Sequence, residues 1–403
     1  MTDQSPTFIP VAGVRLGSAA AGIRYRDQKD LVIVELAADS ACAAIFTRNR
    51  FCAAPVLVAR DHLGRSQPRY LLINSGNANA GTGDDGVRSA LACCRALAAL
   101  RSCAADQVLP FSTGVIGETL PVERLAAALP DALSALNQNG WLDAARAIMT
   151  TDTVPKLCSR RMEYCGEHFT VTGMAKGSGM IRPDMATMLA YIATDLAVDP
   201  VLLQQCLERA AAPSFNAITV DGDTSTNDAC VLVATAQSGC APVNSAASEL
   251  FQRLCEAVEA VCMELALAIV KDGEGATKLV QITVEEALTG AEAREVAYTI
   301  AHSPLVKTAL FASDPNWGRI LAAIGRADVP GLEIGKVELW LGEVCIVSGG
   351  GRAAGYTEAA GQAVMDAEEI LIRVVLGRGD VSATVYTCDL SHEYVRINAE
   401  YRS

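Results

Sequence analysis

Residues 173–189 read Gly-Met-Ala-Lys-Gly-Ser-Gly-Met-Ile-Arg-Pro-Asp-Met-Ala-Thr-Met-Leu, and the predicted fold and chemistry follow from this stretch. A glycine-rich polar loop runs into an apolar segment, and Thr187 stands at the junction, directly after the small residue Ala186. A threonine hydroxyl there can attack the preceding carbonyl carbon and turn the Ala186–Thr187 amide into an ester that water opens. Thr187 would become a new N-terminus, whose α-amine, with an ordinary pKa of about 7.7–8.0, can accept the hydroxyl proton. The pattern indicates self-cleavage; the alternative is an ordinary loop-to-strand junction.

Seven further motifs follow one another along the chain. They are Asn-Ser-Gly-Asn-Ala-Asn-Ala (74–80), Ser-Thr-Gly-Val-Ile-Gly (112–117), Thr-Thr-Asp-Thr-Val-Pro-Lys (150–156), Thr-Val-Asp-Gly-Asp-Thr-Ser-Thr-Asn-Asp (219–228), Val-Lys-Asp-Gly-Glu-Gly-Ala-Thr-Lys (270–278), Asp-Pro-Asn-Trp-Gly-Arg (314–319) and the ending Ile-Asn-Ala-Glu-Tyr-Arg-Ser (397–403). With residues 173–189 they resemble the ornithine acetyltransferase family, the glutamate N-acetyltransferases of the cyclic arginine pathway. Three departures are Asp184 where Asn is expected, Gly81 where Cys is common and Ser403 where Thr is common.

The resemblance implies a fold and an assembly. The expected fold class is α/β, an αββα-like sandwich of the self-processing N-terminal-nucleophile type, built from two intertwined fragments. Those fragments would be residues 1–186, the alpha chain, and residues 187–403, the beta chain that begins with the nucleophile Thr187. Two alpha and two beta chains are expected to form a tetramer.

The resemblance also implies a reaction, an acetyl transfer from N2-acetylornithine to glutamate through an ester on Thr187. Whether acetyl-CoA is a second acetyl donor, which would make the enzyme bifunctional, is left open, and no cofactor is expected. Thr113 and Gly114 are expected to form the oxyanion hole, although the residues alone indicate only a turn. Glu274 alone would indicate the end of a helix. The expected substrate-binding residues are Thr150, Lys176, Thr187, Glu274, Asn398 and Ser403.

Hydrophobic periodicity predicts alternating strands and helices, which is typical of layered α/β folds. The expected strands are Leu31–Leu36, Tyr70–Ile73, Phe169–Met174, Met188–Ile192, Cys230–Ala234, Leu279–Val284, Lys336–Leu341, Glu343–Ser348, 369–375, 382–388 and 393–398. The expected helices cover 86–101, 122–136, 140–149, 200–212, 247–271, 304–311, 317–325 and 357–367.

Composition narrows the function classes. The 403 residues are 51% hydrophobic and carry a formal net charge of −13, which argues against nucleic-acid and anionic-membrane partners. The N-terminus lacks the features of a secretory signal and no apolar run reaches membrane-spanning length, so we expect a cytoplasmic protein. The 14 cysteines are scattered without a Cys-x-x-Cys motif and are expected to be reduced, and the four histidines show no ligand spacing. We therefore expect no metal site.

Two rival classes remain open. A self-cleaving aminopeptidase or amidase would use the same nucleophile but release the acyl group to water, and an assay with and without glutamate separates it from a transferase. A binding or structural protein would never cleave itself, so denaturing electrophoresis would show one uncut chain.

Overall fold

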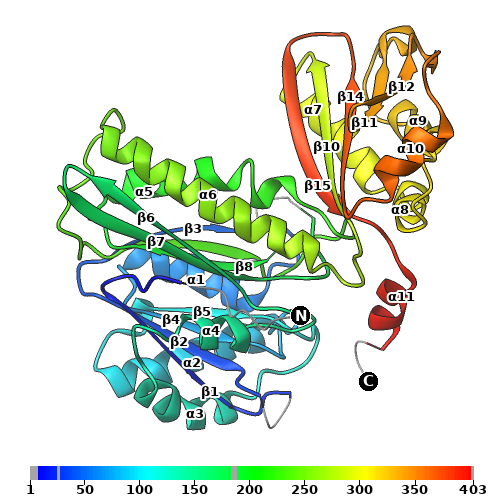
Figure 1. Ribbon diagram of the computed structural model, residues 1–403. Coiled ribbons are helices and arrows are strands. Elements are labelled where there is room, and N and C mark those ends of the chain that lie inside the picture. The colour runs from blue at the N-terminus through cyan, green and yellow to red at the C-terminus, as the bar shows by residue number, and fades with distance from the viewer. Residues whose placement is uncertain (1–7, 25–27, 183–187, 401–403) are drawn as a thin grey trace. The chain divides into compact units, whose positions relative to one another are not determined.

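The computed structural model describes residues 8–24, 28–182 and 188–400. These residues form two compact units (Figure 1). Unit 1 comprises Met1–Asn216 and Asp223–Ile269, and unit 2 comprises Ala217–Gly222 and Val270–Ser403. The chain thus leaves unit 1 for a few residues, returns to it, and leaves it again near the end of a long helix.

Unit 1 contains two sheets. The first has the strand order β1-β2-β4-β5 and the second the order β3-β9-β8-β7-β6. The strands of the first sheet are β1 (Val14–Ala19), β2 (Leu31–Leu36), β4 (Tyr70–Asn74) and β5 (Val108–Ser112); those of the second are β3 (Ala41–Phe46), β6 (Lys156–Tyr164), β7 (Glu167–Lys176), β8 (Leu189–Thr194) and β9 (Ala229–Ala234).

The sheets of unit 1 are layered with helices. In β2, Val32 and Val34 face the second sheet, while Leu31 and Ile33 point the other way, because successive side chains of a strand alternate between faces. Both faces are covered, so all six residues of β2 are buried. The helices that cover the outer face of the first sheet are α2 (Gly83–Arg101) and α3 (Val122–Ser134), and those on the second sheet are α5 (Pro200–Ala211) and α6 (Glu249–Lys271) (Figure 1). The layers run helix, sheet, sheet, helix, which confirms the predicted sandwich. Two further helices are α1 (Ala54–Arg65) and α4 (Trp141–Ala147).

The second sheet interleaves strands from both sides of position 187. Strand β7 pairs antiparallel with β8, and β3 pairs antiparallel with β9. Strands β3, β6 and β7 precede residue 187 in the sequence, while β8 and β9 follow it. Cutting the chain between β7 and β8 would leave the backbone hydrogen bonds of this sheet in place. Two fragments produced by such a cut would therefore share one sheet, as the prediction of intertwined fragments requires.

Unit 2 contains one six-stranded sheet with the order β13-β12-β11-β14-β10-β15. Helix α7 packs on β10 and β15 through a core that includes Ile282, Val296 and Ile300. The strands are β10 (Leu279–Ala287), β11 (Glu338–Leu341), β12 (Val344–Ser348), β13 (Gly351–Arg352), β14 (Glu369–Val375) and β15 (Val381–Cys388). The helices are α7 (Gly290–Ala301), α8 (Pro304–Phe311), α9 (Trp317–Gly325), α10 (Glu358–Met365) and α11 (His392–Ala399).

One predicted element is wrong. Residues 393–398 were expected to form a strand but lie in helix α11. The hydroxyl of Ser391 accepts a hydrogen bond from the Glu393 N–H and caps the helix. Arg396 pairs with Glu393 and Glu400, three and four residues away, a spacing that places side chains on the same face of a helix.

Other elements were missed rather than misassigned. Periodicity did not predict β1, β3, β5, β6, β13, α1 or α7. Strand β5 contains Pro110, which normally argues against a strand because proline cannot donate to the sheet. The structure tolerates it because β5 is an edge strand and pairs only with β4.

Candidate active site

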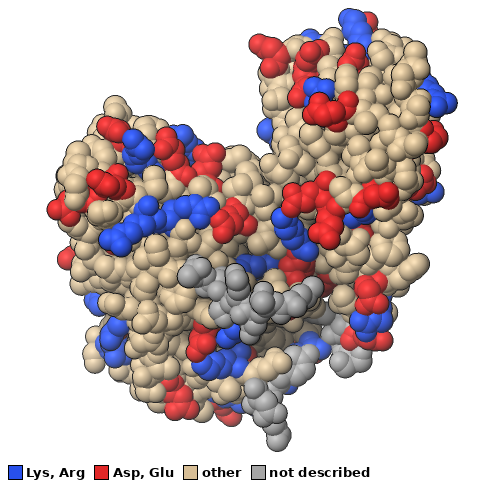
Figure 2. Space-filling model, viewed as in Figure 1, with Lys and Arg blue, Asp and Glu red and all other residues tan. Residues whose placement is uncertain are grey.

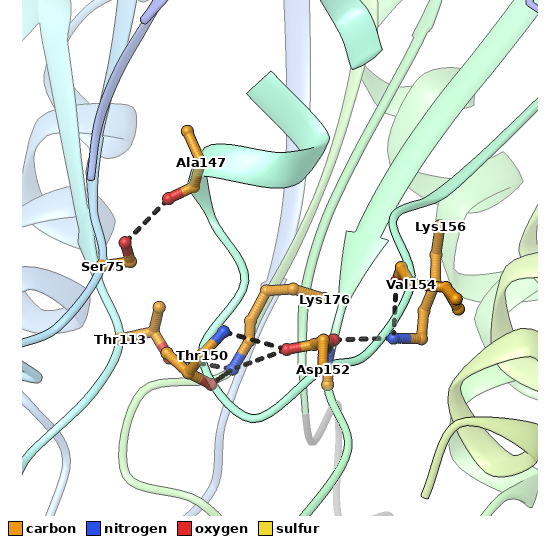
Figure 3. Close-up of polar contacts among 9 residues, drawn as sticks. Ser75, Thr113, Ala147, Thr150, Asp152, Val154, Lys156 and Lys176 are labelled. Carbon is orange, nitrogen blue, oxygen red and sulfur yellow. Dashed lines mark hydrogen bonds and ion pairs between the residues drawn. The ribbon is translucent and has the colours of Figure 1, made fainter. Parts of the chain in front are cut away.

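Lys176 is the charged centre of a group of polar side chains in unit 1. It is the last residue of β7, where it pairs with Leu189 at the start of β8. Its Nζ donates hydrogen bonds to Oγ1 of Thr150 at 2.8 Å and Oγ1 of Thr113 at 3.2 Å (Figure 3). Lys176 is only 9% exposed. Three segments that are distant in the sequence therefore meet at one ammonium group.

The ammonium group makes the Thr113 hydroxyl oxygen a hydrogen-bond acceptor. A lysine ammonium only donates hydrogen bonds, so the Thr113 oxygen must be the acceptor and its own hydrogen must point elsewhere. Among the described residues, no acceptor takes that hydrogen. The hydroxyl is thus oriented to donate to a further oxygen, as an oxyanion hole requires.

Gly114 is placed where no other residue fits. Its φ is +134°, a backbone conformation that side chains disfavour. A Cβ at this position would lie 2.3 Å from the carbonyl carbon of Gly76 and 2.5 Å from the N atom of Asn77. The backbone of the Ser112–Gly114 turn can approach the 74–80 segment closely only because residue 114 is glycine.

Asn227 ties this turn to the segment that precedes β9. Its Nδ2 donates to the carbonyl oxygens of Ala78 at 2.6 Å and Ser112 at 2.9 Å. The neighbouring Asp228 is 3% exposed, and its Oδ2 has no hydrogen-bond partner among the described residues. Burial raises the pKa of Asp228 well above its ordinary value, and a hydrogen bond from Ser225 and the positive charge of Lys176 oppose this only in part.

Asp152 is the anion of the site. Its Oδ1 accepts hydrogen bonds from Nζ of Lys156 at 2.7 Å and from the Gly177 N–H at 2.7 Å. Its Oδ2 accepts from the Thr150 N–H at 3.1 Å and lies 4.0 Å from Nζ of Lys176 (Figure 3). Burial alone would raise the pKa of Asp152, but Lys176, Lys156 and these donors outweigh it and hold the pKa at about 2.

Two of the expected substrate-binding residues lie in unit 2. Glu274 follows α6, is 8% exposed, and accepts a hydrogen bond from Nδ2 of Asn398 in the exposed helix α11 at 2.7 Å. The loop after Glu274 is held by Asp389, whose carboxylate accepts from the N–H groups of Thr277 and Lys278 and from the Thr277 hydroxyl. The loop of Glu274 is therefore built separately from the Lys176 group.

The structure brings together four of the expected site residues in unit 1, namely Thr113, Gly114, Thr150 and Lys176. Ala186, Thr187 and Ser403 lie outside the described residues, so the cleavage site and the nucleophile stay predictions. Sequence reasoning missed Asp152, Lys156, Asn227 and Asp228, although all four lie inside motifs that carried the resemblance. Asp152 lies in a loop and Lys156 begins β6, so the helical spacing rule did not apply and apolar periodicity gave no signal for their ion pair.

Other kinds of site find little support in the described part of the chain. Within residues 8–24, 28–182 and 188–400, no cluster of three or more His, Cys, Asp or Glu side chains could hold a metal ion. None of the helices in these ranges is both long and apolar enough to cross a bilayer. On the face shown in Figure 2, basic side chains lie among acidic ones on both units.

Similarity to known proteins identifies the family. The ArgJ family model matches residues 15–403, which is nearly the whole chain. The chain belongs to the ArgJ family. It is 60% identical over 394 residues to the arginine biosynthesis bifunctional protein ArgJ of Methylococcus capsulatus, covering 98% of this chain and 96% of that one. It is 56% identical over 398 residues to the protein of the same name from Pseudomonas fluorescens, covering 99% and 98%.

A solved ArgJ structure agrees with this assignment. The crystal structure of arginine biosynthesis bifunctional protein ArgJ from Bacillus halodurans is 35% identical in sequence, with a TM-score of 0.50, and covers 52% of this chain and 98% of that chain. The ArgJ family is the ornithine acetyltransferase family that the motifs resemble. The predictions of an acetyltransferase and of a role in arginine biosynthesis are confirmed.

Proposed function

We propose that this ArgJ-family enzyme transfers an acetyl group from N2-acetylornithine to glutamate through an ester on Thr187. The Thr187 oxygen attacks the acetyl carbonyl carbon while its proton passes to the Thr187 α-amine. The C–N bond then breaks, and ornithine leaves with that proton. The α-amine of glutamate attacks the ester, gives up a proton, and departs as N-acetylglutamate while Thr187 regains its hydroxyl.

One observation carries the proposal, the contact of the Lys176 ammonium with the hydroxyls of Thr113 and Thr150. This contact leaves the Thr113 hydrogen directed away from Lys176, where it can stabilise the oxyanion of each tetrahedral intermediate together with the Gly114 N–H. The reaction handles two amino acids that share an α-carboxylate. A buried ammonium is the natural partner for that carboxylate, so Lys176 and Thr150 are assigned to substrate binding.

In unit 2 we assign Glu274 and Asn398 to substrate binding as well, with Ser403 completing the set. Glu274 is a buried carboxylate with an amide partner, and such a group suits a substrate ammonium. No resident cofactor is proposed. Acetyl-CoA is proposed as a second acetyl donor, which the bifunctional name of the relatives supports.

A direct assay tests the reaction. Purified enzyme is incubated with glutamate and either N2-acetylornithine or acetyl-CoA, and N-acetylglutamate is measured by mass. Formation from acetylornithine is expected to depend on glutamate. Release of acetate at the same rate without glutamate would mean that the enzyme is a hydrolase instead. A reaction with N2-acetylornithine but not with acetyl-CoA would mean that acetylornithine is the acetyl donor and acetyl-CoA is not.

Cleavage at Ala186–Thr187 is part of the proposal. The interleaved strands of the second sheet support it, since the fragments stay joined after the cut. The Bacillus halodurans chain, which corresponds to only about half of this one, also supports it. N-terminal sequencing should find a fragment that starts at Thr187. Thr187→Ala should leave one uncut, inactive chain, whereas Thr187→Ser should still cut because only a hydroxyl is required; a start at another residue would move the nucleophile.

The proposed assembly is a tetramer of two alpha and two beta chains in the cytoplasm. Separate fragments would expose the edges of β7, β8, β3 and β9, which favours permanent association of each pair. Size-exclusion chromatography coupled to light scattering measures the mass. A species of one alpha and one beta chain would refute the tetramer and leave the chemistry intact.

A further inference from the structure

Two buried lysines share one buried carboxylate in unit 1. Lys156 and Lys176 flank Asp152, whose side chain is 0% exposed. One carboxylate and two ammonium groups leave this set with one net positive charge. Buried charges of this kind are tolerated only when their partners and hydrogen bonds are well placed.

The two lysines differ in what else they contact. The Lys156 side chain is 1% exposed, and its Nζ contacts Oδ1 of Asp152 and, at 3.4 Å, the carbonyl oxygen of Val154. The Lys176 side chain is 11% exposed and reaches the hydroxyls of Thr113 and Thr150. Among the contacts of the described residues, Lys156 holds Asp152, while Lys176 joins Asp152 to the two threonines.

We propose that Asp152 is a positioning residue for acetyl transfer, because its carboxylate holds the Lys176 ammonium against the Thr113 and Thr150 hydroxyls. This inference rests on the proposed function. Asp152 does not touch the substrate; it acts through Lys176, whose position sets the direction of the Thr113 hydroxyl hydrogen. It also anchors the Gly177 N–H, at the start of the loop that follows β7. Lys156 keeps the carboxylate in place.

Two readings of the cluster make opposite predictions. If only the net charge matters, the positive set attracts the substrate carboxylate, and removing Asp152 should tighten substrate binding. If Asp152 positions Lys176, removing it should impair catalysis whatever the net charge. A pair of substitutions that keeps the net charge separates the two.

The test compares three variants with the wild-type enzyme. Asp152→Asn raises the net charge of the set by one, Lys156→Met lowers it by one, and the double variant Asp152→Asn with Lys156→Met restores the wild-type value. We expect the double variant and Asp152→Asn both to lose at least about 30-fold in kcat/KM, the scale of a broken buried charge pair. Lys156→Met should lose less, mainly through KM. A double variant within about threefold of wild type would overturn the proposal.

The pH profile and a crystal structure give readouts that a merely structural role would not change. An ammonium that loses a nearby carboxylate gives up its proton at lower pH, so the alkaline limb of kcat/KM should move to lower pH in Asp152→Asn. In a crystal structure of the double variant, Nζ of Lys176 should no longer contact both threonine hydroxyls. If Nζ of Lys176 still contacts both hydroxyls, the proposal fails. This structural readout applies even if the double variant does not cleave itself.

A matched control separates positioning from a general loss of stability. Asp195 lies just after β8, at the end of that strand remote from Leu189, and its carboxylate accepts the Thr170 N–H without contacting a lysine. Asp195→Asn should leave kcat/KM within about threefold, as expected for an isosteric change away from the site. A wild-type enzyme that makes no N-acetylglutamate would refute the proposed function, while the crystal structure would still decide the role of Asp152.

Discussion

The Asp152 cluster of unit 1 and the Glu274 loop of unit 2 hold their carboxylates in different ways. Asp152 is surrounded by two buried lysines, the N–H of the buried Gly177 and the part-buried N–H of Thr150. Glu274 is held by the amide of Asn398, on the largely exposed helix α11. The loop of Glu274 is fixed instead by Asp389, through the backbone N–H groups of Thr277 and Lys278.

The difference shows where each region obtains its geometry. In the Asp152 cluster, opposite charges in a poorly solvated interior orient the side chains, so a change to any member is expected to disturb the others. In the Glu274 loop, hydrogen bonds fix the backbone and leave the Glu274 side chain with an exposed partner. Substitutions in the Asp152 cluster should therefore have large effects on catalysis. In the Glu274 loop, substitutions of the backbone anchor should lower stability, and substitutions of the exposed partner should have small effects.

The largest expected effect comes from the hydroxyl that the Lys176 ammonium orients. Thr113→Ala should lower kcat by about 10²–10³-fold with little change in KM, because one oxyanion donor is lost. Steady-state kinetics on enzyme shown by electrophoresis to be fully cut measures this. Thr119→Ala, at an exposed position just beyond the turn, is the control. A cut Thr113→Ala enzyme with near-normal kcat would move the oxyanion hole elsewhere.

The next effect tests the backbone anchor in unit 2. Asp389→Ala removes the acceptor of three hydrogen bonds, two of them from backbone N–H groups. Leaving the buried Lys278 N–H and the part-buried donors of Thr277 without this acceptor should lower the free energy of unfolding by about 3 kcal/mol. Urea denaturation with a local probe in unit 2 measures it. A loss below about 1 kcal/mol would show that the Glu274 loop does not depend on this anchor.

Acid should weaken the Asp152 cluster. The folded-state pKa of about 2 lies below the ordinary 3.8, so the stabilisation is complete above pH 4 and is lost as the pH falls toward 2. This difference corresponds to about 2 kcal/mol. Unfolding free energies of wild type and Asp152→Asn, measured between pH 6 and pH 2, should converge by that amount at low pH. A difference that does not change with pH would mean that the lysines do not lower the pKa of Asp152.

The smallest effect is expected at Asn398. Asn398→Ala removes an exposed hydrogen-bond partner of Glu274, so kcat/KM should fall only about three- to tenfold and unfolding should change by less than about 0.5 kcal/mol. Asn139→Ala, another exposed asparagine, is the control for both measurements. If Asn398→Ala lost as much activity as Thr113→Ala, the two regions would not differ in the way proposed.

Much of the architecture was predictable from local patterns. Strands such as Leu31–Leu36 and helices such as α6 were found because their apolar runs or periodicity are strong. Strand β5 and helix α11 were not found. Strand β5 contains Pro110, which is tolerated because β5 lies at the edge of its sheet, and α11 is a short, mostly exposed helix that begins at the cap Ser391. Apolar periodicity reports neither the edge position of a strand nor the capping of a helix.

The sequence by itself determined the family and the reaction class, and it predicted part of the site, because short contiguous motifs carry this information. Only the tertiary structure decided that Asp152 serves Lys156 and Lys176 together, and that Lys176 reaches Thr113 across 63 residues of sequence. The register of β7 with β6 and β8, and the parallel pairing of β4 with β5, bring these strand ends into place. A hydrogen bond depends on distance in space, and spacing along the chain does not encode that distance until the sheets have formed.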